Sequence, residues 1–184
     1  MLVNLTLNGA RLEEDVRPDM TLLDFCRAHG YKSVKCACET SSCGLCTVLL
    51  DGEPVLSCSI MMARADGHEV TTLEGMRDGR RELLAQCLAE EGAEQCGFCA
   101  PGLEMAVLAL DAARAHADDE TVRRYLSGNL CRCSGYASQM RAIRRFLARH
   151  EAGGELPPRE VPDDPTTESG ERHAQIARPV AKKD

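Results

Sequence analysis

The 184-residue chain has few aromatic side chains: three Phe, three Tyr and no tryptophan. Any core must therefore be built from Leu, Val, Ala and Met, which a hydrophobic content of 43% can supply. The N-terminal segment lacks the basic start and the apolar run of a secretory signal, and no apolar stretch reaches membrane-spanning length. We therefore expect a cytoplasmic chain without a membrane span.

Positive charge and the common catalytic motifs are also scarce. The formal net charge of -7 argues against a nucleic-acid partner held through its phosphates. The sequence has no G-x-G-x-x-G, no Walker A motif, no H-E-x-x-H and no carboxylates at catalytic spacing. We therefore expect no catalytic residue on this chain, and no site of its own for FAD or for a substrate.

Cysteine, in contrast, is abundant, with eleven residues. A reducing cytosol keeps thiols free, so this number indicates metal ligation or redox chemistry more than a disulfide framework. Two cysteines in apolar helical segments, Cys26 and Cys87, are expected to be small buried hydrophobic residues. The five histidines show no ligand spacing with the cysteines or with each other.

The first dense cysteine motif is "CETSSCGLC", which continues to one further cysteine after the next predicted hairpin. The spacing C-x4-C-x2-C-x11-C matches that of plant-type [2Fe–2S] ferredoxins, in which a loop wraps the cluster. Small residues between the cysteines, such as Ser42 and Gly44, allow the backbone to approach closely. A zinc site is the alternative, although it would more usually show two C-x2-C pairs. The four candidate ligands are Cys38, Cys43, Cys46 and Cys58.

A second set of cysteines lies in "QCGFCAPG" and "GNLCRCSGY", with the spacing C-x2-C-x31-C-x-C. Each pair falls at a junction between predicted helices. Taken alone, this set is less specific, because a C-x2-C pair also suits a zinc knuckle or a redox dithiol. The four candidate ligands are Cys96, Cys99, Cys131 and Cys133.

The pattern around these motifs predicts an α+β protein. Residues 1–76 read as hairpins turning at Asn8-Gly9 and Asp51-Gly52, a helix between Thr21 and Gly30, and a last strand over 68–76. Residues 77–150 read as helices over 81–92, 100–117, 118–129 and 136–150. Four arginines of the last helix are expected on a solvated face: Arg141, Arg144, Arg145 and Arg149.

The C-terminal segment 151–184 is polar and contains five prolines. It has no apolar periodicity, so it cannot bury a core of its own. Prolines favour an extended path. We expect an extended arm that lies on a partner subunit.

The three cysteine motifs, in this order and spacing, resemble those of the iron–sulfur small subunits of the xanthine oxidase, or molybdenum hydroxylase, family. That family includes aldehyde oxidoreductases and carbon monoxide dehydrogenase, and the resemblance covers about residues 1–150. It implies two [2Fe–2S] clusters, one in a ferredoxin-like β-grasp domain (1–76) and one in a four-helix-bundle domain (77–150). It also implies a heterotrimer in which this chain relays electrons from a molybdopterin centre in a large subunit to FAD on a medium subunit, or to another acceptor.

The resemblance also assigns residues. It implies that Gln95 hydrogen-bonds the pterin of the large subunit and that the sulfur of Cys133 lies against that pterin. Asn129 could be a simple helix C-cap. The chain departs from the family's usual residues at Ala37 and Ser41, where Gly is usual, and at Ala100, where Thr is usual. Cys36 is an additional cysteine, and only Cys38 gives the x4 spacing.

Two other functions remain open at this stage. A free-standing two-cluster ferredoxin would also be acidic, although it has little need of a pterin-facing motif. A zinc-binding interaction module would be colourless, because zinc sites have a filled d shell. The substrate of the complex is not encoded in this chain, because the substrate pocket would lie in another subunit.

Overall fold

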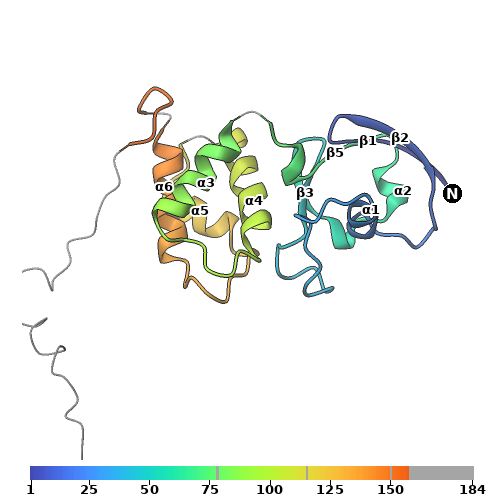
Figure 1. The fold of residues 1–184 in the computed structure, drawn as a ribbon, viewed down its shortest axis with the longest axis horizontal. Helices are drawn as coiled ribbons and strands as arrows, with labels where there is room; N and C mark the ends of the chain where they lie inside the picture. Colours follow the sequence, from blue (N-terminus) through green and yellow to red (C-terminus); the bar gives the residue numbers. More distant parts are fainter. Residues whose placement is uncertain (78, 115, 150, 158–184) are drawn as a thin grey trace, which may run out of the picture.

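The computed structural model describes residues 1–77, 79–114, 116–149 and 151–157. They form a sheet domain and a helical domain that lie side by side, with the N-terminus at the far end of the sheet domain (Figure 1). Within the described residues, no helix is both long and apolar enough to cross a membrane.

The sheet domain is built from two hairpins and one later strand. Strands β1 (Leu2–Leu7) and β2 (Ala10–Asp15) pair antiparallel, as do β3 (Thr47–Leu50) and β4 (Glu53–Leu56). Both predicted turns are confirmed: Asn8 and Gly9 have φ of 51° and 84°, and Asp51 and Gly52 have 51° and 85°. Positive φ at both central residues gives the twist that a two-residue hairpin needs.

Strand β5 (Glu69–Thr71) joins the hairpins, parallel to β1 and antiparallel to β3, in the order β2-β1-β5-β3-β4. The expected strand over 68–76 is wrong beyond Thr71, because the chain turns into a 3-10 helix, Leu73–Gly75. Side-chain bonds cause this departure: Asn8 accepts from the Thr72 N–H at 2.8 Å and donates to the Thr72 hydroxyl at 3.0 Å.

Helix α1 (Leu22–Ala28) covers one face of the sheet. Thr21 caps its N-terminus by accepting from the Asp24 N–H, and Gly30, with φ of 86°, follows its C-terminal end as predicted. Its apolar side packs into a core with the strands, and a short helix α2 (Met62–Ala65), which the sequence pattern did not predict, packs there too. Cys26 is fully buried in this core, as expected.

The helical domain contains α3 (Arg80–Glu90), α4 (Ala100–Ala113), α5 (Asp119–Tyr125) and α6 (Ala137–Ala148). All four predicted helices are present, with somewhat shorter bounds. Helix α4 is buried along most of its length because it packs between the other helices and strands β3 and β4. Leu49 of β3 belongs to the helical core, whereas its neighbour Val48 belongs to the sheet core. The α+β class is thus confirmed, with β3 covered on both faces.

The expectation of a solvated face is wrong for Arg141, Arg145 and Arg149, which are partly or fully buried, and is confirmed for Arg144, which is exposed. Each pairs with an acid from another helix: Arg141 with Glu91, Arg144 with Asp119, Arg145 with Glu90 and Arg149 with Asp111. Arg149 is only 5% exposed, and its guanidinium donates to Asp111 at 2.6 Å. A buried charge needs such a partner, so these pairs fix α6 against α3, α4 and α5.

The described start of the C-terminal segment returns to the helical domain. The Pro157 carbonyl accepts from Arg145 Nε at 2.7 Å, and Leu156 packs against the helical core. The remainder of the expected arm, residues 158–184, lies outside the described residues.

The two domains meet through backbone groups. The Leu130 N–H donates to the Cys43 carbonyl at 2.9 Å. Asn129 donates through Nδ2 to the carbonyls of Gly44 and Gly102, at 3.4 and 3.3 Å. Asn129 is therefore a bridge between the domains. Glycine is required at this contact, because a Cβ on Gly102 would lie 2.4 Å from the Gly44 carbonyl oxygen.

We expect Gly102→Ala to push the domains apart. Overpacking of this kind costs about 1–3 kcal/mol, and here the obstructing atoms are backbone. The thermal unfolding midpoint of the cluster-loaded protein should fall. Gly128→Ala is the matched control, because a Cβ there meets nothing within 4 Å. Equal midpoints for the two variants would contradict this account of the interface.

Candidate metal centres

The first centre is a loop without regular structure between α1 and β3. Its backbone takes left-handed conformations at Glu39, Ser41 and Gly44, with φ of 52°, 58° and 73°, so it winds tightly. Two of its cysteines, Cys43 and Cys46, are buried. The remaining two candidate ligands of the set, Cys38 in the loop and Cys58 in a 3-10 turn after β4, are partly buried.

The thiols of this first set approach each other in pairs. Backbone N–H groups of Thr40 and Ser42, together with the Cys43 thiol, lower the pKa of Cys38 to about 6. The Ser42 N–H lies 3.4 Å from the Cys38 sulfur. Burial raises the pKa of Cys46 to about 11, and the neighbouring Cys58 thiol adds to this increase. The pairs are thus Cys38 with Cys43 and Cys46 with Cys58.

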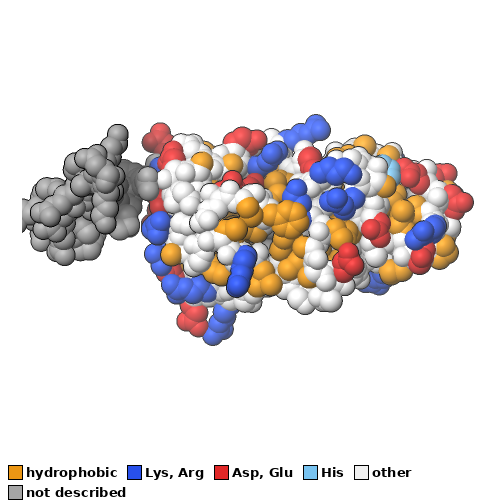
Figure 2. All heavy atoms as spheres, turned by 60° about the horizontal axis from the view of Figure 1, so that its bottom comes forward, with side chains coloured by type: hydrophobic (Ala, Val, Ile, Leu, Met, Phe, Trp, Pro, Cys, Tyr) orange, Lys and Arg blue, Asp and Glu red, His pale blue; other side chains and the backbone are white. Residues whose placement is uncertain are grey.

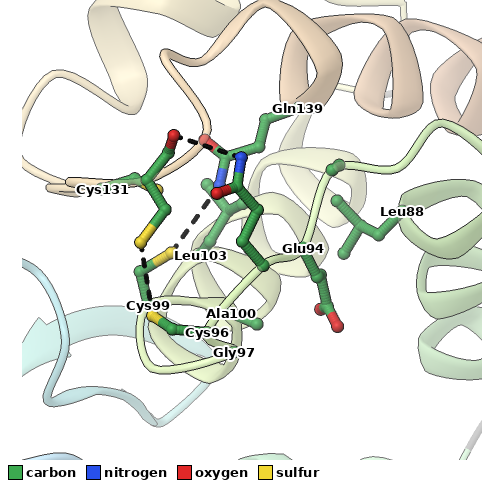
Figure 3. A pocket seen from close by; sticks show the side chains of 12 residues that line it. Leu88, Glu94, Cys96, Gly97, Cys99, Ala100, Leu103, Cys131 and Gln139 are labelled. Carbon is green, nitrogen blue, oxygen red and sulfur yellow. Dashed lines mark hydrogen bonds between the residues drawn. The ribbon is translucent and has the colours of Figure 1, made fainter. Parts of the chain in front are cut away.

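The second centre joins two helix junctions. Cys96 and Cys99 lie between α3 and α4, with Cys99 at the N-terminus of α4, and Cys131 and Cys133 lie between α5 and α6. Figure 3 shows Cys96, Cys99 and Cys131 converging, with Gln139 of α6 beside them. This convergence brings together cysteines that are far apart in the sequence.

Pairing recurs in this second set. The Cys133 and Cys96 sulfurs are 3.5 Å apart. Burial and then the Cys131 thiol raise the pKa of Cys99 to about 11. Desolvation opposes ionisation of Cys131, but hydrogen bonds from the Ser134 hydroxyl and N–H, the Cys133 backbone and the Cys99 thiol together lower its pKa to about 7. The Ser134 hydroxyl lies 3.2 Å from the Cys131 sulfur.

Three polar residues at this centre were not singled out from the sequence. Ser134 has just been described, and Tyr136 accepts the Cys131 N–H through its hydroxyl at 2.9 Å. Gln139 is 4% exposed, and its Nε2 lies 3.7 Å from the Cys99 sulfur. Gln139 shares a helical stripe with Ile143 and Phe146, so a polar residue on an apolar stripe was the available signal.

Gln95 lies in the exposed loop before Cys96. Its Nε2 donates to the Cys133 carbonyl at 3.2 Å, which holds the two cysteine loops together. Cys96 and Cys133 are both exposed, whereas Cys99 and Cys131 are partly buried. One edge of the centre therefore faces outward, and Gln95 lies at that edge.

Apolar side chains surround the cysteine loops at the surface. Phe98, Leu130 and Tyr136 are 46%, 51% and 41% exposed, and each lies within five residues of a candidate ligand. Figure 2 shows hydrophobic side chains gathered near the middle of one face of the molecule. The Lys35 ammonium lies 5.8 Å from the centre of the Phe98 ring, so a cation–π contact also joins the two domains. Apolar exposure of this kind is typical of a surface that a partner covers.

The donor arrangement fits binuclear iron better than a single ion. Within the described ranges, no group of three or more His, Cys, Asp or Glu side chains is placed closely enough to hold one metal ion, although the cysteine loops themselves come together. A [2Fe–2S] cluster needs two thiolates on each of two irons, and each set supplies two pairs. Backbone N–H and hydroxyl groups directed at the sulfurs suit thiolates.

The spare cysteines behave differently. Cys26 and Cys87 are fully buried, and burial raises the pKa of Cys26 to about 12 and also raises that of Cys87. Cys36 is exposed, and its thiol lies 3.3 Å from a carboxylate oxygen of Glu39. None of these three sulfurs joins the pairs described above.

Comparison with known proteins gives a consistent result. Residues 5–70 match the family of 2Fe-2S iron-sulfur cluster binding domains, and residues 72–144 match that of [2Fe-2S] binding domains. The nicotinate dehydrogenase small FeS subunit of Eubacterium barkeri is 41% identical, over 80% of this chain and 95% of its own. The xanthine dehydrogenase iron-sulfur-binding subunit of Escherichia coli O157:H7 is 42% identical, over 73% of this chain and 86% of its own.

A solved structure agrees with these relatives. Quinoline 2-oxidoreductase from Pseudomonas putida 86 contains a chain that matches with a TM-score of 0.75 and 35% identity, covering 85% of this chain and 98% of that one. Identity at this level over nearly whole chains indicates common ancestry as well as a common fold. The chain therefore belongs to the family of small [2Fe–2S] subunits of the molybdenum hydroxylases, and it is the electron-transfer component of an oxidoreductase complex.

Proposed function

We propose that this chain carries electrons from a molybdopterin centre in a large subunit through its two clusters to FAD on a medium subunit, or to another acceptor. The observation that carries the proposal is the convergence of eight cysteines, in two sets of two pairs, on loops that touch each other. When bound, each cluster takes up and releases single electrons. The chain's own residues hold the clusters, set their surroundings and fix their separation.

The proposed ligands follow from the pairs. In the ferredoxin-like domain (1–76), Cys38 and Cys43 would hold one iron, and Cys46 and Cys58 the other. In the helical domain (77–150), the corresponding pairs are Cys96 with Cys133 and Cys99 with Cys131. The segment 151–184 is proposed as an arm for a partner subunit.

A short backbone route joins the two ligand sets. Cys131 follows Leu130 in the chain, and the Leu130 N–H donates to the carbonyl of Cys43, a proposed ligand of the other cluster. The backbone of Leu130 and one hydrogen bond therefore connect Cys131 of one centre to Cys43 of the other. This contact supports the proposal that electrons move between the clusters within the chain.

The outward edge of the helical centre is proposed to face the molybdopterin. Cys96 and Cys133 are exposed there, and the apolar residues Phe98, Leu130 and Tyr136 provide a surface that a large subunit can cover. We propose that the Gln95 amide and the Cys133 sulfur contact the pterin. In this isolated chain the amide is held by the Cys133 carbonyl, which orients it at that edge.

The alternatives have less support. The relatives named above are subunits of dehydrogenases, which favours a complex over a free-standing ferredoxin. The matches to two families of [2Fe-2S] binding domains disfavour a zinc module. Co-purification with a larger subunit would distinguish the first alternative, and a visible spectrum the second. We also propose the cytoplasm as the location, because its reduced thiols suit eleven free cysteines.

Serine substitutions should separate ligands from spare cysteines. We expect about four irons and four sulfides per loaded chain, since each cluster contributes two of each. Cys43→Ser should remove or alter only the ferredoxin-like cluster, and Cys99→Ser only the helical one, as seen by electron paramagnetic resonance. Cys26→Ser and Cys87→Ser are controls that should leave both signals. The assignment of Cys38 as the first ligand is wrong if Cys36→Ser abolishes a cluster while Cys38→Ser does not.

Gln95→Ala should leave the iron content unchanged but slow reduction of the clusters by substrate in the whole complex. Loss of one positioning hydrogen bond, about 1 kcal/mol, corresponds to roughly fivefold in rate. Single-turnover reduction measured by absorbance tests this. Gln86→Ala is the matched control, because among the described residues the Gln86 side chain bonds Glu90, on the exposed side of α3. An unchanged rate for Gln95→Ala would reject the role.

A further inference from the structure

Ser41 has a backbone conformation that a serine rarely adopts. Its φ of 58° lies in the left-handed region, where a Cβ approaches the backbone too closely and where glycine is free of that cost. The residue lies between the proposed ligands Cys38 and Cys43, in an exposed part of the loop. A side chain kept at a strained backbone position indicates that the side chain itself has a role.

The Ser41 hydroxyl reaches across the loop to a sulfur. Its Oγ lies 3.6 Å from the sulfur of Cys58, which is 17 residues later in the chain. Between a neutral thiol and a hydroxyl either group could be the donor. An iron-bound thiolate has no proton, so with Cys58 as a ligand the hydroxyl must donate and the sulfur accept.

The neighbouring serine makes a useful contrast. The Ser42 hydroxyl donates to the Thr40 carbonyl at 3.0 Å and lies 3.3 Å from the Thr40 hydroxyl, both within its own loop. Only the Ser42 backbone N–H, and not its side chain, bonds a cysteine sulfur, that of Cys38. Two adjacent serines of one loop therefore differ in whether the hydroxyl touches a proposed ligand.

We propose that the Ser41 hydroxyl donates a hydrogen bond to the Cys58 thiolate and thereby raises the reduction potential of the ferredoxin-like cluster. Reduction adds negative charge to the cluster and its sulfurs. A donor directed at a ligand sulfur stabilises the reduced form more than the oxidised form, because the bond strengthens as charge accumulates. The proposal rests on the assignment of Cys58 as a ligand. Ser41 is thus a positioning residue for the electron-transfer reaction.

The consequence is a bias in the direction of electron flow. A higher reduction potential makes the electron more stable on the ferredoxin-like cluster than on the helical one. The electron is therefore drawn away from the edge that is proposed to face the pterin. The helical cluster has its own hydroxyl donor, Ser134 to Cys131 at 3.2 Å, so the balance between the clusters depends on both serines.

The test is a redox titration of the cluster-loaded full chain, followed by electron paramagnetic resonance. Ser41→Ala and Ser41→Gly should each shift the ferredoxin-like signal toward the oxidised form by about tenfold at fixed potential. This equals ~59 mV for one electron. The helical signal should not move. Ser42→Ala, the matched control, should leave both potentials unchanged. In deuterated water, pulsed resonance should detect an exchangeable deuteron in the native protein that Ser41→Ala lacks.

Two results would reject the proposal, and a third would show that the assignment of Cys58 as a ligand is wrong. An unchanged potential in Ser41→Ala with full iron content rejects it. A shift in Ser41→Gly but not in Ser41→Ala assigns the effect to the loop backbone and also rejects it. If Cys58→Ser leaves the cluster intact, the ligand assignment itself has failed. Should Ser41→Ala not hold its cluster, Ser41→Gly decides through both readouts, because glycine suits the observed φ: a lowered potential together with loss of the deuteron supports the proposal, and any other result rejects it.

Discussion

The hydrogen bond from the Leu130 N–H to the Cys43 carbonyl is the contact on which the arrangement of this protein depends. It places a loop of the helical domain directly on the cysteine loop of the sheet domain. Such backbone contact is possible only because glycines at positions 44 and 102 leave no side chain between them. The covering of β3 by α4, and the bridge made by Asn129, both follow from this close approach. Backbone groups therefore determine how closely the two cysteine loops approach each other.

Around that contact, each centre uses a few polar groups to favour thiolates. Cys38 and Cys131 each have a backbone N–H directed at the sulfur, and the Gln139 amide lies 3.7 Å from the Cys99 sulfur. Outside the centres, charge is handled by ion pairs between helices, among which Arg149 with Asp111 is deeply buried. Polar groups near the sulfurs thus surround the proposed ligands, whereas the arginine–carboxylate pairs hold the helices together.

The sequence was most informative where structure is local. Hairpins at Asn8-Gly9 and Asp51-Gly52 were predictable because two-residue turns favour residues that adopt positive φ. The C-x4-C-x2-C spacing indicated a [2Fe–2S] cluster. Contacts between distant segments were not predictable. Arg141, Arg145 and Arg149 looked solvent-exposed because their acidic partners lie in distant segments of the chain. Asn129 looked like a helix cap because its two acceptors come from residues 44 and 102. Ser41 looked like a small replacement for glycine because a hydroxyl–sulfur contact over 17 residues leaves no local pattern.

The two centres also differ in how much chain each one needs. The first lies between Cys38 and Cys58, inside a domain with its own core, whereas the second requires residues from Cys96 to Cys133 and the helices around them. Domains made first during synthesis can fold first. All four proposed ligands of the ferredoxin-like site therefore precede the helical region in the order of synthesis. If the domains fold in that order, the helical region docks onto a cysteine loop that is already formed, through the Leu130 and Asn129 contacts.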